Sequence, residues 1–220
     1  LAMNTRPDIA HAVSSLAKFM SCPTSAHLAA ARSVLRYVAG TPTLGITYCF
    51  TGSSADQLTG YTDASFAGDL DNRRSTTGYV FLYGGAAITW NSRLQPTVAA
   101  STTEAEYQSC AAAAREALWL RSLFFDLGIS ISGPVRIACD NQGAISLLKN
   151  PLGSARAKHI DVLHHFARER VARNEISFEY VSTELMVADS LTKHSLSPSF
   201  SSAATACSVT LSGGMLGGRV

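Results

Sequence analysis

Four short segments in the middle of this chain each place acidic residues among small polar ones. The segments are Tyr61–Ser65 with Asp63, Ser101–Tyr107 with Glu104 and Glu106, Ile137–Gln142 with Asp140, and Val187–Lys193 with Asp189. Asp63 and Asp140 close apolar runs that are typical of strands, and the glutamates open a long helical pattern. Carboxylates gathered from strand ends and helix starts can hold a pair of hard divalent cations, as phosphodiester hydrolysis requires. Any one of these acids could equally be an ordinary turn or cap residue, but that alternative does not explain the set.

The elements that must position these acids follow from hydrophobic periodicity and turn residues. We expect strands at 58–63, 77–82, 86–91, 135–139 and 176–181, and helices at 101–128, 141–149, 159–174 and from 188 onward. This order predicts the α/β class, with a mixed five-stranded sheet flanked by helices. Asp63 and Asp140 should emerge together at the carboxyl ends of the first and fourth strands.

The two ends of the chain have a different character from this central part. Helices expected at 7–20 and 26–39 and a strand at 44–50 are too little for an independent core, so they must pack on another part of the protein. A Gly- and Ser-containing linker at 51–56 follows them. The chain from Ser195 onward is rich in Ser, Ala and Gly, and we expect no structure there. Because Leu1 stands in what looks like the middle of an element, we expect the chain to be a fragment.

Composition leaves nucleic-acid binding open. The 220 residues are 46% hydrophobic, enough for one or two domains, and the formal charge is only +2. The basic residues are nevertheless concentrated in one stretch, which comprises Arg156, Lys158, His159, His164, His165, Arg168, Arg170 and Arg173. Such a stripe could follow a phosphate backbone, or it could be a solvated helix face.

The cysteines and the apolar runs bear on the compartment. Five scattered cysteines show neither zinc-ligand spacing nor a disulfide framework, which favours a reducing compartment. We find no signal peptide and no apolar run long enough to span a bilayer.

Several longer motifs resemble a known family. Asp69–Tyr79, Gln95–Ala99 running into the glutamate segment, and Lys158–Val162 resemble the ribonuclease H region of Ty1/copia-type LTR retrotransposon Pol polyproteins. Asn4–Ile9 and Leu35–Pro42 are similar to the C-terminal thumb or connection part of the reverse transcriptase. The resemblance therefore implies a reverse-transcriptase part at 1–50, an RNase H domain at 57–195, and a disordered tail at 196–220.

The resemblance also implies an activity and a site. The fold would be RNase H-like, and the reaction would be endonucleolytic hydrolysis of the RNA strand of RNA–DNA hybrids during reverse transcription. The family's four acids map onto Asp63, a glutamate of the Glu104/Glu106 pair, Asp140 and Asp189, which would hold two Mg²⁺ ions, replaceable by Mn²⁺.

Partners and surroundings follow from the same resemblance. Gln142, Ser65 and Thr103 are candidates for contacts with the hybrid near the RNA 2′-hydroxyl. The other partner would be the remainder of the Pol polyprotein, with no membrane involved. The location would be a cytoplasmic virus-like particle or the nucleus.

Helical phase favours Glu106 over Glu104 as the catalytic glutamate. Ser101 and Glu104 have capping-box spacing, in which the glutamate turns back to the N-cap amide. Steps of three and four from Glu106 instead follow a small and apolar stripe that can lie against the sheet. Thr103 and Glu106 have capping-box spacing as well, so the alternative stays open at this point.

The sequence departs from the family pattern at two points, and two other functions are also open. Cellular RNases H carry a histidine just before the last aspartate, and Ser182–Val187 offers none; His159 is the nearest candidate. The polymerase aspartate motif is also absent. A non-catalytic RNase H-like module that binds nucleic acid and tethers the polymerase, or an inert transposon relic, are the alternatives to an active nuclease.

Overall fold

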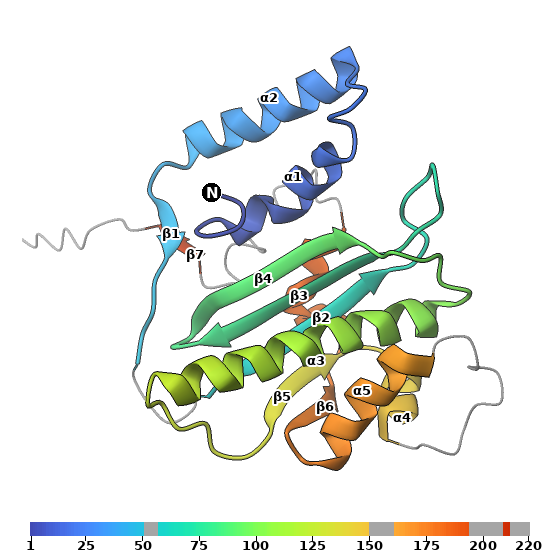
Figure 1. Cartoon of the computed structure of the whole chain (residues 1–220). Helices are drawn as coiled ribbons and strands as arrows, with labels where there is room; N and C mark the ends of the chain where they lie inside the picture. Colours follow the sequence, from blue (N-terminus) through green and yellow to red (C-terminus); the bar gives the residue numbers. More distant parts are fainter. Residues whose placement is uncertain (51–56, 150–160, 194–208, 212–220) are drawn as a thin grey trace, which may run out of the picture.

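A five-stranded mixed sheet forms the centre of the structure (Figure 1). The computed structural model describes residues 1–50, 57–149, 161–193 and 209–211. The strands are β2 (Thr59–Ser65), β3 (Thr76–Tyr83), β4 (Ala86–Leu94), β5 (Val135–Cys139) and β6 (Ile176–Tyr180), in the spatial order β4-β3-β2-β5-β6. Neighbours among β2, β3 and β4 are antiparallel, whereas β5 runs parallel to β2 and β6 parallel to β5. The predicted α/β class, with a mixed five-stranded sheet flanked by helices, is confirmed.

Three helices cover one face of the sheet. They are α3 (Thr102–Asp126), which crosses the sheet, and α4 (Gln142–Lys149) and α5 (Asp161–Ala172), which pack beside it (Figure 1). The sheet-facing side of α3 is mostly alanine, including the fully buried Ala113, Ala114 and Ala117. Small side chains let the helix backbone approach the strands closely, while Phe81, Ile137 and Phe178 fill the remaining space. Among the described residues, no helix combines the length and the apolar character that crossing a membrane would require.

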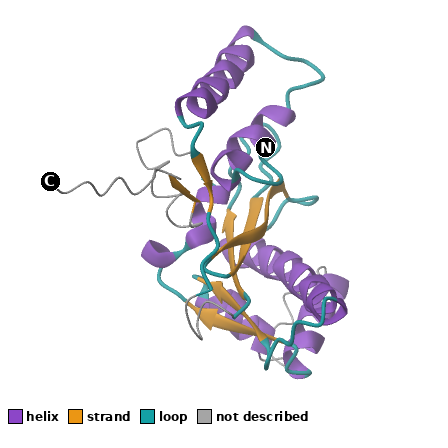
Figure 2. Cartoon of the chain, turned by 90° about the vertical axis from the view of Figure 1, so that its left-hand side faces the viewer, coloured by secondary structure: helices purple, strands orange, loops and turns teal. Residues whose placement is uncertain are grey.

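The opposite face is covered by the N-terminal segment and by a short 3₁₀ helix. The N-terminal elements are η1 (Pro7–Ile9), α1 (Ala10–Ala17), α2 (Ser25–Gly40) and β1 (Leu44–Ile46). α1 packs on β4 and places Ala10 in a core cluster with Trp90. The Trp90 indole also donates a hydrogen bond of 2.7 Å to the Ala2 carbonyl. The segment that was expected to need a packing partner therefore lies on the sheet through α1. α2 packs on α1 and bonds to η1 through Tyr37 and Asp8, and none of its own residues is buried (Figure 2).

Several element boundaries differ from the predicted ones. The helix expected at 7–20 starts as a 3₁₀ turn and ends at Ala17, and the strand expected at 44–50 ends at Ile46. The helix expected from 188 is a 3₁₀ segment, η3 (Val187–Leu191), which follows η2 (Thr183–Leu185). Within the tail that was expected to lack structure, β7 (Val209–Leu211) pairs antiparallel with β1. The linker at 51–56 and the start of the basic stripe, including Arg156, Lys158 and His159, lie outside the described residues.

Gly78 in β3 is the point where η3 rests on the sheet. A Cβ atom at this position would lie 2.6 Å from Thr192 Cγ2, 3.0 Å from Leu191 Cβ and 3.2 Å from the Ala188 carbonyl oxygen. The missing side chain therefore lets η3 approach the backbone of β3. This close approach fixes the height of Asp189 above the sheet.

Replacing Gly78 with Ala should destabilise the fold by about 1–3 kcal/mol, because the new methyl group overpacks the contact with η3. Gly40→Ala is the matched control, since a Cβ there meets nothing within 4 Å. That variant should be as stable as the parent or up to about 1 kcal/mol more stable. Urea denaturation of both variants measures the difference, and equal stabilities would contradict the tight contact.

Candidate active site

Asp63 and Asp140 lie side by side where the pairing of β2 with β5 ends, although β2 itself continues to Ser65 along β3. β2 and β5 are parallel, and their register pairs Thr62 with Cys139. The next residue of each strand's chain is therefore an aspartate at the same carboxyl edge. Asp63 is buried with 3% exposure, whereas Asp140 is partly exposed. The predicted juxtaposition of these two acids at the sheet edge is confirmed by this register.

A buried hydroxyl pair fixes α3 against β2 at the same point. The Ser109 hydroxyl donates to the Asp63 carbonyl oxygen at 2.7 Å and lies 2.8 Å from Thr62 Oγ1. Ser109 and Thr62 are both fully buried. Glu106 precedes Ser109 by three residues, which places it on the same helix face. Docking α3 through Ser109 therefore brings the Glu106 carboxylate to the sheet edge.

Glu106 is buried, with one of its two carboxylate oxygens unpaired. Oε1 accepts a hydrogen bond of 3.2 Å from the Ala64 amide, directly after Asp63. Oε2 has no hydrogen-bond partner among the described residues, although the side chain is only 6% exposed. A buried polar atom without a partner is costly, so this oxygen is the atom in the site that most requires a ligand.

Glu104 serves the start of α3 instead. The Ser101 hydroxyl accepts from the Glu104 amide at 3.1 Å, and Glu104 Oε2 accepts from the Ala100 amide at 2.9 Å. The Glu104 side chain thus turns back toward the helix start. It bonds to the Ala100 amide, one residue before the Ser101 amide that the capping box predicts. This orientation leaves Glu106 as the glutamate that faces Asp63.

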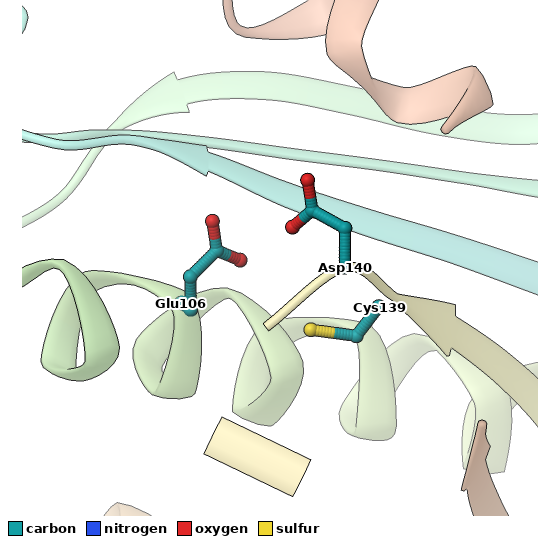
Figure 3. A group of neighbouring side chains, drawn as sticks. All are labelled: Glu106, Cys139 and Asp140. Atoms are coloured by element: carbon teal, nitrogen blue, oxygen red, sulfur yellow. The ribbon is translucent and has the colours of Figure 1, made fainter. Parts of the chain in front are cut away.

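Glu106 and Asp140 share their space with a thiol. Ligand atoms of Glu106, Cys139 and Asp140 all lie within 4.8 Å of one another (Figure 3). Figure 3 shows the Glu106 carboxylate turned toward Asp140, with the Cys139 sulfur below them beside α3. Cys139 had no place in the site predicted from the sequence. Its position directly before Asp140 was the signal for its place in the site.

Asp189 joins the site from η3, together with two residues that the sequence analysis did not single out. The Thr192 hydroxyl donates to Asp63 Oδ2, and the Lys193 ammonium pairs with Asp189. Lys193 stands four residues after Asp189, a spacing typical of helical ion pairs that could have revealed it. Thr192 could be found only from the packing of η3 on Gly78.

The loop that lacks the expected histidine contributes a hydroxyl. Thr183 in η2 donates to Asp140 Oδ2 at 2.8 Å. This contact holds the Asp140 carboxylate, which is the least buried of the three acids at the strand and helix ends. The loop therefore still contacts the site, but through a hydroxyl, which does not change its charge near neutral pH as an imidazole does.

Burial dominates the electrostatics of the site. It raises the pKa of Glu106 to about 9, with the charge of Asp63 adding to the effect. Burial also raises the pKa of Asp63, against the hydrogen bond from Thr192, while Asp189 and Asp140 raise it further. A hydrogen bond from Cys110 lowers the pKa of the Cys139 thiol. These acids repel one another, so bound divalent cations are the species that would let all of them ionise at neutral pH.

The three candidates for substrate contacts surround this edge. Ser65 is the last residue of β2, and the exposed Gln142 is the first of α4. Thr103 is partly buried in the first turn of α3, within 3.4 Å of the position that a Cβ of Gly143 would occupy. The starts of α3 and α4 therefore meet beside the acidic residues.

The described arginines of the basic stripe all have partners within the protein. Arg168 donates to the Leu147 carbonyl at 3.0 Å, Arg170 pairs with Glu175 at 3.2 Å, and Arg173 pairs with Glu169 at 2.5 Å. Among the described residues of the stripe, the arginines thus favour the solvated-helix interpretation over a phosphate track.

Comparison with known proteins points to one family. The chain is 47% identical over 189 residues to the retrovirus-related Pol polyprotein from transposon TNT 1-94 of Nicotiana tabacum, covering 86% of the chain and 14% of that protein. It is 43% identical over 206 residues to the Pol polyprotein from transposon RE1 of Arabidopsis thaliana, covering 94% of the chain and again 14% of that protein. The chain thus spans about a seventh of the length of these relatives. No protein-family model matches it.

Other similarities are shorter or weaker. The secreted RxLR effector protein 161 of Plasmopara viticola is 46% identical over 120 residues, which cover 54% of the chain and 83% of that protein. Among solved structures, LC11-RNase H1 from compost gives a TM-score of 0.47 at 16% identity and covers 62% of the chain and 93% of that structure. The same enzyme in complex with an RNA/DNA hybrid gives 0.46 at 14%, covering 62% and 94%. Both TM-scores are below 0.5, so the assignment to the α/β class comes from the strand order and helices of the chain itself.

In the absence of divalent metal, the free energy of unfolding should fall as pH rises from about 5 to about 9. Unfolded chains release the Glu106 proton near the ordinary pKa of 4.5, whereas the folded protein keeps it until about 9, so rising pH favours the unfolded state. The slope from this one group is at most about 1.4 kcal/mol per pH unit.

Urea denaturation at several pH values, with a chelator present to remove divalent metal, measures this fall in the free energy of unfolding. Glu106→Gln should remove most of the slope, and Glu104→Gln should leave it in place, because Glu104 caps the start of α3. A slope that survives in the Glu106 variant would contradict the burial of this carboxylate.

Proposed function

Because the chain belongs to the Pol polyproteins of copia-type LTR retrotransposons, we propose that it is a ribonuclease H. It hydrolyses the RNA strand of RNA–DNA hybrids during reverse transcription. The observation that carries this proposal is the buried Glu106 carboxylate, which lies beside Asp63 and Asp140 and has one oxygen without a hydrogen-bond partner among the described residues. A protein that only binds nucleic acid gains nothing from such a cluster, which repels phosphate unless cations neutralise it.

Two Mg²⁺ ions, replaceable by Mn²⁺, fit the donor set. Asp63, Glu106, Asp140 and Asp189 would hold them, since hard cations take oxygen ligands and keep several waters. When bound, the ions supply Lewis-acid stabilisation of the scissile phosphate and lower the pKa of the attacking water.

The protein's own contribution is to orient the carboxylates before the substrate arrives. Thr192 holds Asp63, Thr183 holds Asp140, and the Ala64 amide holds Glu106. Each carboxylate is thereby restricted to one orientation, so less reorganisation is needed when cations and phosphate bind. Hydrogen bonds of this kind support a site that acts through fixed charges.

Recognition of the RNA strand would involve the edge next to these acids. Ser65, Thr103 and Gln142 offer hydroxyl and amide groups where β2, α3 and α4 meet. Such groups can contact the backbone and the 2′-hydroxyl that distinguishes RNA from DNA in the minor groove. The hybrid would therefore lie across the starts of α3 and α4.

The remainder of the Pol polyprotein is the proposed partner. Residues 1–50 would be the C-terminal part of its reverse transcriptase and residues 57–195 the RNase H domain, with activity in a cytoplasmic virus-like particle or the nucleus. Binding of the hybrid by both parts together is supported by the basic stripe. Its described arginines bond within the protein and so leave limited positive charge for contacts with a duplex.

The chain should cleave RNA only in a hybrid and only with Mg²⁺ or Mn²⁺. Asp63→Asn keeps the side-chain shape and removes its charge, so the rate should fall about 10³-fold or more, as loss of several kcal/mol of charge stabilisation implies. Cleavage of an end-labelled hybrid, with single-stranded RNA and duplex DNA as control substrates, gives the rates. Wild-type rates in the Asp63 variant would contradict the metal assignment, and binding without any cleavage by the parent would favour the non-catalytic alternative.

Glu106→Gln and Glu104→Gln form a matched pair on the same helix turn. The first should abolish cleavage, because its carboxylate faces Asp63. The second should cost about 1 kcal/mol of stability, as the loss of a cap does, with cleavage retained. Rates and denaturation midpoints of both variants separate the two roles, and loss of cleavage only in the Glu104 variant would reverse the assignment.

Hybrid affinity should rise by about 100-fold when the polymerase part of a related Pol polyprotein is added to the chain, because a linked second binding surface acts at high effective concentration. Fluorescence anisotropy with a labelled hybrid at fixed salt measures both constants. An unchanged dissociation constant would show that the chain binds its substrate alone.

A further inference from the structure

The thiol of Cys139 gives the proposed metal site a donor that magnesium does not use. Its sulfur lies within 4.8 Å of carboxylate oxygens of both Glu106 and Asp140. Hard cations such as Mg²⁺ prefer oxygen, whereas Zn²⁺ and Cd²⁺ bind thiolates strongly. The same pocket therefore contains ligands for two different classes of cation.

We propose that Glu106, Cys139 and Asp140 form a site for a thiophilic divalent cation, Zn²⁺ in a cell, which excludes Mg²⁺ and inhibits the nuclease. The inhibition rests on the proposed function, whereas the binding site itself depends on the geometry alone. One sulfur and two oxygens, with a water in the fourth position, complete the tetrahedral set that zinc prefers.

The distances are compatible with such a site. Bonds of about 2.0 Å to oxygen and about 2.3 Å to sulfur separate tetrahedral ligand atoms by roughly 3.3–3.6 Å. The present separations are at most 4.8 Å, so each pair of ligand atoms needs to approach by no more than about 1.5 Å. Glu106 and Asp140 stand on different elements, α3 and the end of β5, and their side chains already turn toward each other (Figure 3).

An independent observation indicates that a ligand belongs here. Glu106 Oε2 is buried without a hydrogen-bond partner among the described residues, and Glu106 as a whole is only 6% exposed. Cys139 is fully buried, and the Asn141 amide lies 3.4 Å from its sulfur as a donor that can stabilise a thiolate. A cation between them would pair the oxygen, and the thiol proton would pass to the buffer as the sulfur–metal bond forms.

Inhibition follows from the shared carboxylates. A cation held by Glu106, Cys139 and Asp140 occupies two of the four acids that Mg²⁺ needs. Thiolate coordination is stronger than oxygen coordination for zinc, so excess Mg²⁺ would displace it poorly. Free zinc would then set the fraction of active nuclease.

Cadmium is the probe, because its bond to a thiolate gives an ultraviolet charge-transfer absorption that does not depend on activity. The full chain is used with Cys22, Cys49 and Cys207 replaced by Ser, so that Cys110 and Cys139 are the only thiols. One equivalent of Cd²⁺ should produce the absorption. Cys139→Ser and Cys139→Ala should abolish it, and circular dichroism shows whether each variant is folded.

Cys110→Ser is the matched control, since this buried thiol lies next to Cys139 but outside the cluster of three ligands. It should keep the absorption. Glu106→Gln should weaken cadmium binding by at least about tenfold, as loss of a ligand does. An absorption that survives in folded Cys139 variants, or disappears in the Cys110 variant, overturns the proposed ligand set, as does unchanged affinity in the Glu106 variant.

Cleavage of the hybrid tests the inhibition. For each variant, the rate in Mg²⁺ plus Cd²⁺ is divided by the rate of the same variant in Mg²⁺ alone. Cd²⁺ should inhibit the parent and the Cys110 variant, and the Cys139 variants should resist it. Mg²⁺-dependent cleavage without the cadmium absorption would refute this site and leave the proposed function standing. The absorption without any hybrid cleavage would refute the proposed function and leave the thiophilic site standing.

Discussion

The burial of Glu106 next to Asp63 constrains most of the surrounding structure. A carboxylate that is removed from water and placed beside another acid is unfavourable, and its pKa rises to about 9 as a result. Ser109 secures α3 by bonding to the Asp63 carbonyl, and the alanine face of the helix lets it lie close to the strands. On the other face, Gly78 lets η3 bring its own acid toward the same edge. The fold thus assembles mutually repelling groups, which explains why divalent cations are part of the proposed function.

The sequence predicted the parts of this arrangement that depend on local periodicity. The predicted strands end at Asp63 and just before Asp140, and two parallel strands bring their carboxyl ends to one edge, so these acids could be placed together without coordinates, although β2 runs on to Ser65. Helical phase likewise distinguished Glu106 from Glu104, since only the former lies on the apolar stripe of α3. Regular elements repeat a pattern over many residues, and such patterns are visible in a sequence.

The remaining parts of the site depend on contacts between distant segments. Thr192 bonds to Asp63 across 129 residues of sequence, and Thr183 bonds to Asp140 across 43. Cys139 could not be placed in the site from the sequence, because a strand pattern shows which residues point inward but not what lies beside them. The helix expected from residue 188 is instead the 3₁₀ segment η3, which packs on Gly78. No local sequence signal distinguishes such a 3₁₀ segment from a short α-helix.

The central claim is that divalent cations bind at the edge formed by β2, α3, β5 and η3, and paramagnetic broadening by Mn²⁺ tests it most directly. Small amounts of Mn²⁺ are added to the isotope-labelled chain, and the loss of each amide signal is followed by NMR. The account predicts that the amides of Ala64, Asp140 and Asp189 broaden first, while Gly128, at the far end of α3, stays sharp. Broadening centred on the acidic loop Asp69–Asn72, or uniform over the chain, would contradict a metal centre at these carboxylates.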